Sequence, residues 1–123
     1  MTEMVHKEVT EQIIGAAFEV YQHLGYGFLE SVYRKAMLVE LSLRGISAMD
    51  EQPIAVAYKG SAVGRFQADL LVENCVIVEL KIAKEYQPFD EPQLLNELKA
   101  TGITVGLLIN FGKSKVAFKR FVY

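Results

Sequence analysis

Residues 76–82 read Val76-Ile77-Val78-Glu79-Leu80-Lys81-Ile82, an aliphatic run that carries one acid and one base. Short runs of β-branched and aliphatic residues are typical of strands that are buried on both faces. Strand side chains alternate between faces, so Glu79 and Lys81 project from the same face. Charges in a buried strand cost free energy unless they are paired, solvated at a strand end or bound to a metal ion. The run therefore predicts either an ion pair at the mouth of a strand or a metal-binding carboxylate beside a lysine that steers a water molecule.

Length and composition predict one globular domain over residues 1–123. Hydrophobic residues make up 51% of the chain and charged residues 23%, which argues against intrinsic disorder. The single cysteine, Cys75, excludes an intrachain disulfide and metal sites of the CxxC type. Residues 1–11 are polar and lack the apolar centre of a signal peptide, and the longest apolar run, 103–109, is too short to cross a bilayer. We therefore expect a cytoplasmic protein without a membrane partner.

The charge of the chain is unevenly distributed. The formal net charge is −2, which argues against a strong non-specific nucleic-acid binder. Residues 98–123 nevertheless contain no acid and five bases, namely Lys99, Lys113, Lys115, Lys119 and Arg120. These bases predict either a patch that faces phosphates or separate solvated strand ends, and the sequence does not decide between the two.

Hydrophobic periodicity places two helices before the first strand. Apolar stripes at helical spacing predict helices at about 9–23 and 29–44, each followed by glycine. The period then changes to two, which predicts strands at 51–58, 63–72 and 76–82. Because the loops between these strands are short, the strands must form an antiparallel meander.

The second half of the chain predicts a βαβ unit. Asp90-Glu91-Pro92 begins a helix that ends at Gly102, and the apolar strand at 103–109 follows. This strand should lie parallel to 76–82, because a helix connects the two. A turn at 110–112 then leads to a last strand at 115–122. The sequence therefore predicts an α/β fold of order α-α-β-β-β-α-β-β, with helices on the faces of a mixed sheet.

The length of one hairpin loop decides whether Asp69 meets Glu79. With a two-residue loop, Ala68 lies opposite Glu79 and Asp69 faces away. With a three-residue loop at 73–75, Asp69 lies opposite Glu79. Two adjacent carboxylates repel each other unless a cation lies between them, so the longer loop predicts either a fault in folding or a divalent-metal site. We expect the three-residue loop, because the metal-site hypothesis depends on it.

An acid on one strand of a hairpin, followed by Glu79-x-Lys81 on the next, resembles the signature of the PD-(D/E)xK nuclease superfamily. The core of that superfamily has a helix, a three-strand meander, a crossover helix and a further strand, which matches the order predicted above. Gly27-Phe28-Leu29-Glu30-Ser31-Val32-Tyr33 has the G-x-x-E-x-x-Y spacing that names the GxxExxY protein family, and segments 93–102 and 106–112 look like the second half of the same family. The resemblance runs from about Ile13 to the C-terminus. It implies a restriction-endonuclease-like mixed five-stranded sheet with flanking helices.

The resemblance also implies a nuclease that hydrolyses phosphodiester bonds of DNA or RNA with a metal-activated water. Hard oxygen ligands suit Mg²⁺ or Mn²⁺. Lys81 would position or activate the attacking water, and Gln93 would contact that water or the substrate phosphate. The implied metal ligands are the side chains of Glu30, Asp69 and Glu79 and the backbone carbonyl of Leu80.

Two positions depart from the family pattern. Ala68 precedes the key acid where the superfamily commonly has proline, which leaves the metal ligands intact. Glu97 stands where the family would have an aromatic residue, so a candidate stacking or phosphate contact is lost and a negative charge is added. Glu97 therefore puts the grip on the substrate, and with it the activity, in question.

Structural roles are open for several of these residues. Glu30 can serve the helix dipole alone, and Gln93 can support the first helical turn. Tyr33 is predicted to be a packed core residue rather than a catalyst. The alternative function is a catalytically weak or inactive nuclease-fold module that binds nucleic acid or a protein partner. A homo-oligomer is compatible with either function, because a small nuclease needs more surface to hold a duplex, although no residue pattern indicates one.

Overall fold

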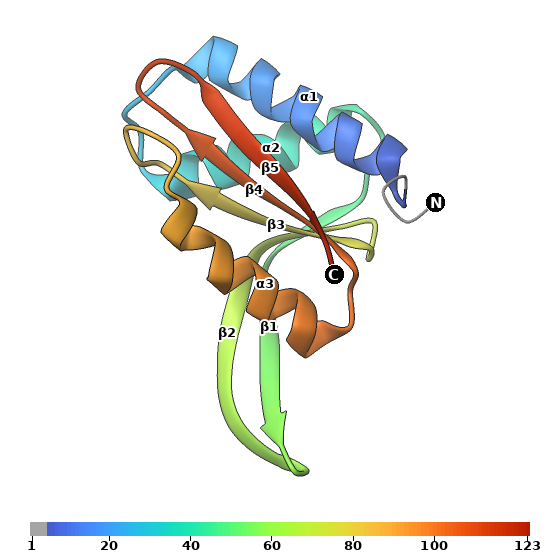
Figure 1. Cartoon of the computed structure of the whole chain (residues 1–123). Helices are drawn as coiled ribbons and strands as arrows, with labels where there is room; N and C mark the ends of the chain where they lie inside the picture. Colours follow the sequence, from blue (N-terminus) through green and yellow to red (C-terminus); the bar gives the residue numbers. More distant parts are fainter. Residues whose placement is uncertain (1–4) are drawn as a thin grey trace.

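A five-stranded sheet lies between two helices on one face and a third helix on the other in the computed structural model (Figure 1). The structure describes residues 5–123, so residues 1–4 of the polar N-terminal segment lie outside the described range. No helix within residues 5–123 is long and apolar enough to cross a membrane. In chain order the elements are α1 (Lys7–Leu24), α2 (Glu30–Leu43), β1 (Ala48–Tyr58), β2 (Ser61–Val72), β3 (Val76–Lys81), η2 (Pro88–Asp90), α3 (Glu91–Thr101), β4 (Val105–Phe111) and β5 (Val116–Val122).

The strands are arranged in the order β1-β2-β3-β4-β5. The first three are antiparallel neighbours, β3 and β4 are parallel, and β5 returns antiparallel to β4. The predicted meander, the βαβ unit and the element order are therefore confirmed. The outer halves of β1 and β2 continue past the rest of the sheet as a long hairpin that projects from the body (Figure 1).

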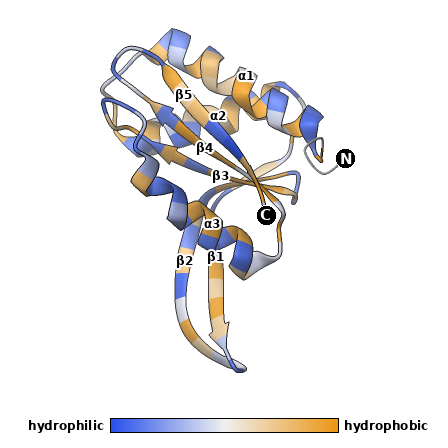
Figure 2. Cartoon of the chain, in the orientation of Figure 1, coloured by the Kyte–Doolittle hydropathy of each residue, from blue (hydrophilic) through white to orange (hydrophobic). Residues whose placement is uncertain are grey.

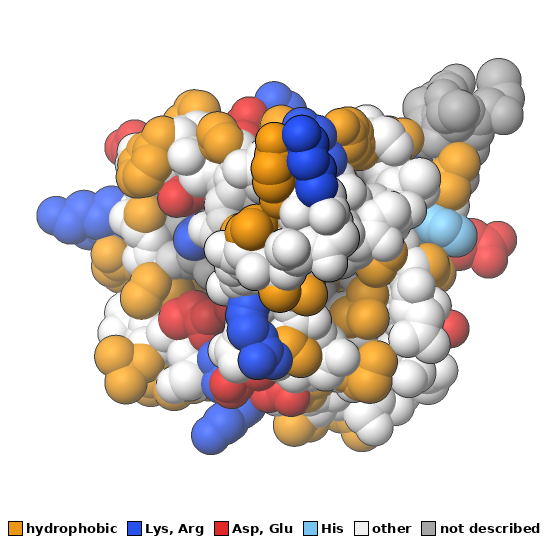
Figure 3. Space-filling view, turned by 90° about the horizontal axis from the view of Figure 1, so that it is seen from below, with side chains coloured by type: hydrophobic (Ala, Val, Ile, Leu, Met, Phe, Trp, Pro, Cys, Tyr) orange, Lys and Arg blue, Asp and Glu red, His pale blue; other side chains and the backbone are white. Residues whose placement is uncertain are grey.

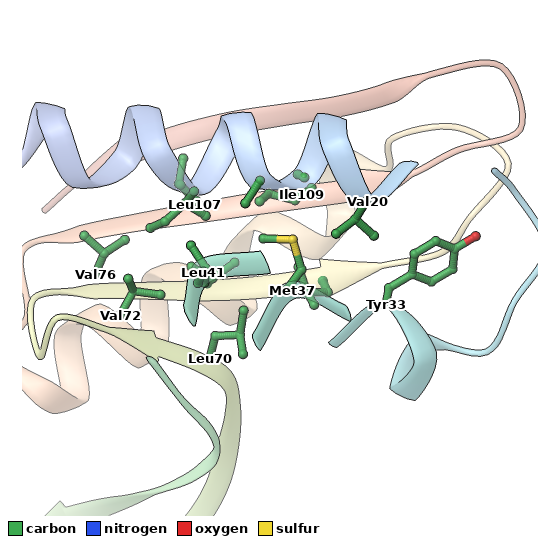
Figure 4. Packing of buried hydrophobic residues seen from close by; sticks show 14 of the residues in the cluster. Val20, Tyr33, Met37, Leu41, Leu70, Val72, Val76, Leu107 and Ile109 are labelled. Atoms are coloured by element: carbon green, nitrogen blue, oxygen red, sulfur yellow. The ribbon is translucent and has the colours of Figure 1, made fainter. Parts of the chain in front are cut away.

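The larger core lies between the sheet and helices α1 and α2. Residues of both helices pack on the inward side chains of β2, β3 and β4 (Figure 4). Tyr33 is fully buried there, stacks on Phe111 with ring centroids 4.4 Å apart, and donates its hydroxyl hydrogen to the carbonyl of Gly25. Tyr33 is thus a packed residue with a satisfied hydroxyl group, as predicted. The labelled residues in Figure 4 are Val20, Tyr33, Met37, Leu41, Leu70, Val72, Val76, Leu107 and Ile109.

The smaller core lies under α3. Leu94 and Leu98 of this helix pack on Ile77 and Leu108. The helix ends at Gly102, whose φ of 76° is a left-handed conformation that glycine adopts without strain. Colouring by hydropathy shows apolar residues interspersed with polar ones along α3 (Figure 2). The helix therefore covers the sheet with one side and exposes the other.

The loop between β2 and β3 has three residues. Val72 pairs with Val76, and the Cys75 N–H donates to the Val72 carbonyl at 3.0 Å. Glu73 and Asn74 have φ values of 51° and 55°, and such a conformation costs free energy for a glutamate. Two hydrogen bonds offset that cost, because Glu73 donates its N–H to the Ser47 carbonyl and accepts the Ser47 N–H on its carboxylate. The predicted three-residue register is confirmed.

The predicted turn at 110–112 begins later than expected. Strand β4 continues through Phe111, so Asn110 lies within a buried strand. Its side-chain amide binds both backbone groups of Ala83, at 3.0 Å to the N–H and 2.9 Å to the carbonyl. A polar side chain is tolerated in this strand because its amide oxygen and nitrogen both bind a loop 27 residues away.

Candidate active site

Strands β2 and β3 separate where the two predicted acids lie. The last paired residues are Leu70 and Val78, so the register brings Asp69 opposite Glu79. Beyond Leu70 and Val78, backbone N–H groups donate to the two carboxylates, and these bonds replace the backbone pairing between the strands. The Leu80 N–H donates to Asp69 Oδ2 at 2.7 Å, and the Asp69 N–H donates to Glu79 Oε2 at 3.2 Å. Asp69 and Glu79 are therefore held side by side at a fork in the sheet.

Helix α3 brings a third predicted residue to this fork. Gln93 lies in the first turn of the helix, and its Nε2 donates to Glu79 Oε1 at 3.2 Å. Its Oε1 accepts a hydrogen bond of 3.2 Å from Lys81 Nζ. Gln93 thus connects the acid and the lysine of the Glu79-x-Lys81 pair across the space between helix and strand. The Gln93 side chain binds two residues of β3. It therefore does more than support the first turn of its own helix.

Glu97 also belongs to this cluster. It lies one helical turn after Gln93, and Gln93 Nε2 approaches Glu97 Oε2 at 3.4 Å. Glu97 is fully buried, and its Oε1 is the one buried side-chain oxygen or nitrogen within residues 5–123 that has no hydrogen-bond partner. The sequence predicted a lost aromatic contact at this position and did not place Glu97 in the site. Its spacing of four residues from Gln93 was the available signal, because such residues share one face of a helix.

Glu30 reaches the fork from the first residue of α2. Its Oε1 accepts a hydrogen bond of 2.7 Å from Arg34 Nη1. Arg34 also binds Asp50 at 3.4 Å and Glu51 at 2.7 Å, so one guanidinium holds three carboxylates. Arg34 was not among the predicted site residues. Its position four residues after Glu30 indicated that one pair, but the two acids from β1 are contacts that only the fold reveals.

The carboxyl groups of the cluster are crowded and desolvated. Burial raises the pKa of Glu79 to about 10, and a hydrogen bond with Glu97 and the charge of Asp69 act in the same direction. Burial also raises the pKa of Glu30 to about 7, with further contributions from the adjacent Asp69 carboxylate, while Arg34 opposes the shift. Burial raises the pKa of Glu97 as well. The surroundings therefore favour the protonated, neutral form of these carboxyl groups over a cluster of ionised ones.

The donor set fits a hard divalent cation in its chemistry. Four carboxyl groups lie close together in pairs, and one of their buried oxygens has no partner. Within residues 5–123, however, no three Asp, Glu, His or Cys side chains are grouped so that they could hold a metal ion as they stand. A convergence of Glu30, Asp69 and Glu79 on one point is thus not present.

Two of the basic residues near the C-terminus, Lys119 and Arg120, do not share one patch. Lys119 and Arg120 are neighbours on β5, so their side chains leave opposite faces of the sheet. Lys119 binds Glu91 at 3.4 Å, whereas Arg120 donates to the carbonyl of Val5. Viewed from the end of the projecting hairpin, basic and acidic side chains are interspersed over the surface (Figure 3). For Lys119 and Arg120, the structure therefore favours separate positions over a shared patch.

Comparison with known proteins decides the family. A family model described as "PD-(D/E)XK nuclease superfamily" matches residues 7–121. The chain belongs to this superfamily. Its mixed five-stranded sheet and the membership together confirm the predicted restriction-endonuclease-like fold. No protein with a curated description has a significant sequence match to this PD-(D/E)XK chain.

Two solved structures are similar to this PD-(D/E)XK domain. One, a protein named SSO0001, has a TM-score of 0.55 and 14% sequence identity, and the match covers 95% of this chain and 58% of that one. The chain therefore spans less than two thirds of that structure. The other, an alkaline exonuclease (LHK-Exo) from Laribacter hongkongensis, has a TM-score of 0.48 and 11% identity, with 92% and 81% of the two chains covered. At these identities the likeness to SSO0001 concerns the fold alone.

Proposed function

We propose that this PD-(D/E)XK protein is a divalent-metal-dependent nuclease that hydrolyses phosphodiester bonds of DNA or RNA. The observation that carries the proposal is the cluster at the fork of the sheet. Asp69 and Glu79 lie side by side, and Gln93 connects Glu79 to Lys81 through hydrogen bonds of 3.2 Å. Carboxylates that suit a divalent cation, next to an ammonium group, supply the electrostatic stabilisation that phosphoryl transfer to water uses.

Each residue would have a distinct role. Glu30, Asp69 and Glu79, with the carbonyl of Leu80, would hold Mg²⁺ or Mn²⁺. Such a cation polarises a phosphoryl oxygen and lowers the pKa of water. The Lys81 ammonium would orient the attacking water and stabilise negative charge that develops on the phosphoryl oxygens. Gln93 would hold the side chains of Lys81 and Glu79 in place relative to each other. Its hydrogen bonds to both residues support this part of its role.

The narrower assignment to the GxxExxY family is part of the proposal. It is supported by how the motif of Gly27, Glu30 and Tyr33 is used. Gly27 has a φ of 113°, a conformation that favours glycine, in the turn before α2. Tyr33 anchors the first turns of that helix in the core, and Glu30 thereby lies at the acid cluster. The spacing of the motif thus serves to position one acid.

A cleavage assay tests the proposal. Single- and double-stranded DNA and RNA would be incubated with Mn²⁺ and the wild-type protein, Lys81→Ala, or the matched control Lys84→Ala, whose side chain is exposed. We expect cleavage by the wild type and the control, and a loss of about 10²-fold or more in Lys81→Ala, because a charge-stabilising group of the transition state is removed. Equal traces of cleavage by all three proteins would indicate contamination and contradict the proposal.

A second candidate function is a catalytically weak or inactive module of the same fold that binds nucleic acid or a protein. Two observations favour it: Asp69 and Glu79 are tied to backbone amides, and Glu97 adds a buried acid at the site. Binding of Mn²⁺ separates the two candidates. A nuclease should bind Mn²⁺ more tightly than its Asp69→Ala variant does, and equal affinities would support the inactive module. Binding of nucleic acid, assembly into a homo-oligomer and a cytoplasmic location stay predictions.

A further inference from the structure

The buried oxygen of Glu97 is an exception among the polar atoms of this protein. Buried polar side chains elsewhere are satisfied: the Thr10 hydroxyl donates to the Lys7 carbonyl, and Asn110 binds both backbone groups of Ala83. Within residues 5–123, Glu97 Oε1 is the single buried side-chain polar atom without a partner. An unpaired acceptor on a fully buried carboxyl group costs free energy, so the position needs an explanation.

The surroundings of Glu97 identify the kind of partner that is missing. Its other oxygen, Oε2, lies 3.4 Å from Gln93 Nε2, and the same nitrogen lies 3.2 Å from Glu79 Oε1. One amide thus holds the carboxyl groups of Glu79 and Glu97 next to each other. A carboxylate oxygen accepts hydrogen bonds or binds cations, and the nearest ammonium, that of Lys81, donates to Gln93 Oε1. The carboxyl group of Glu79 also lies within hydrogen-bonding reach of Glu97, but one of these acids can donate to the other only while it carries a proton. When both groups are ionised, the missing partner is a positive group from outside the chain.

We propose that Glu97 is an additional carboxylate ligand, supplied by α3, for the divalent cation that binds beside Glu79. This inference rests on the proposed function, which supplies the cation. The residue that the family pattern would use for contact with the substrate then serves the metal. Affinity for a hard cation rises with the number of charged oxygen ligands. At position 97, this chain therefore loses a contact with the substrate and gains affinity for the metal.

A metal-binding measurement on the substrate-free protein tests the inference. Mn²⁺ affinity would be determined by calorimetry for the wild type, Glu97→Gln, Asp69→Asn and Glu91→Gln. Glu91 is a matched control, because it lies on the same helix but binds Tyr86 and Lys119 instead of the cluster. We expect Mn²⁺ to bind Glu97→Gln about 10-fold or more weakly than the wild type, and Glu91→Gln as the wild type does.

The melting temperature without metal provides a second readout. Glutamine keeps the shape of glutamate and removes the buried charge, so Glu97→Gln should melt at the same temperature as the wild type or higher. The increase in melting temperature on addition of Mn²⁺ should be smaller than for the wild type, because that increase depends on affinity. A purely structural role would instead lower the melting temperature without metal and leave the Mn²⁺ affinity of the folded variant unchanged. If Glu97→Gln folds poorly, Glu97→Met, which is apolar and similar in volume, takes its place.

The possible outcomes separate this inference from the proposed function. If Mn²⁺ binds the wild type, binds Asp69→Asn weakly and binds Glu97→Gln as tightly as the wild type, the role of Glu97 is overturned and the proposed function stands. If Mn²⁺ does not bind the wild type, both are overturned. Weaker binding to both variants, with normal folding, supports both.

Discussion

The face of the sheet under α1 and α2 buries aliphatic and aromatic side chains, whereas the face under α3 buries two glutamates beside its leucines. The side chains of β3 alternate between the two faces. Val78 and Leu80 point into the larger core, whereas Glu79 and Lys81 point toward α3. Burial of apolar groups stabilises the first face. The second face gives up part of that stabilisation to hold charged groups close together, and this is where we place the chemistry.

Among the predicted effects, the largest is the loss of cleavage in Asp69→Asn. We expect cleavage to fall by about 10²–10³-fold, because an asparagine cannot supply the charge of the acid. Stability should stay constant or rise, since the amide oxygen of the asparagine can still accept the Leu80 N–H and a repulsion with Glu79 is removed. A cleavage assay and urea denaturation of the same preparation measure the two effects. Asp90→Asn, at the start of α3, is the control, and a large loss of stability in Asp69→Asn would contradict the division between the faces.

On the face under α1 and α2, we expect a substitution to lower stability and leave cleavage unchanged. Leu107→Ala removes a fully buried side chain from the larger core and should destabilise the protein by about 2–5 kcal/mol through lost burial and the cavity left behind. Urea denaturation measures the change. Leu43→Ala is the matched control, because Leu43 is 77% exposed and its loss should have little effect. Cleavage per folded molecule should stay unchanged, and a specific loss of activity in Leu107→Ala would show that the faces are coupled.

Taken over one pH unit, the pH dependence of stability is the smallest of the three effects. Without metal, the folded-state pKa values of Glu30 and Glu79 are raised from 4.5 to about 7 and about 10. The folded protein therefore binds more protons than the unfolded chain, and its stability falls as pH rises. Both residues contribute to the fall between pH 4.5 and 7, and Glu79 continues to contribute up to about pH 10. The slope from Glu79 is at most about 1.4 kcal/mol per pH unit.

Denaturation midpoints measured across this pH range test that dependence. Glu79→Gln should flatten the curve, because glutamine does not titrate. Glu85→Gln, an exposed position, should leave the curve as it is. A metal-free protein that gained stability from about pH 5 to about pH 7 would contradict the burial of protonated carboxyl groups under α3.

The sequence predicted the elements and the register that matters most. Alternation and turn residues placed Asp69 opposite Glu79, because a three-residue loop permits that register and a two-residue loop does not. Strand β1 begins at Ala48 instead of residue 51, and η2 precedes α3 without having been predicted. Asn110 was assigned to a turn because nothing in the neighbouring sequence shows that Ala83 would satisfy its amide.

The candidate site was predictable only in part, for a related reason. Glu79 and Lys81 share a strand, so their placement follows from local geometry. Arg34 owes its position to acids on β1, and Glu97 owes its burial to the packing of α3 on the sheet. Such contacts join segments that are distant in sequence, and no local pattern contains them. The convergence of the implied metal ligands likewise depends on side-chain rotations that the element order leaves free.

Two hydrogen bonds at the fork, from the Asp69 N–H to Glu79 and from the Leu80 N–H to Asp69, tie the orientation of both carboxyl groups to the main chain. A carboxylate that swings away to a cation leaves a main-chain donor behind, which must then find solvent or another acceptor. Exchange of the amide hydrogens at residues 69 and 80 therefore reports on the orientation of these two carboxyl groups.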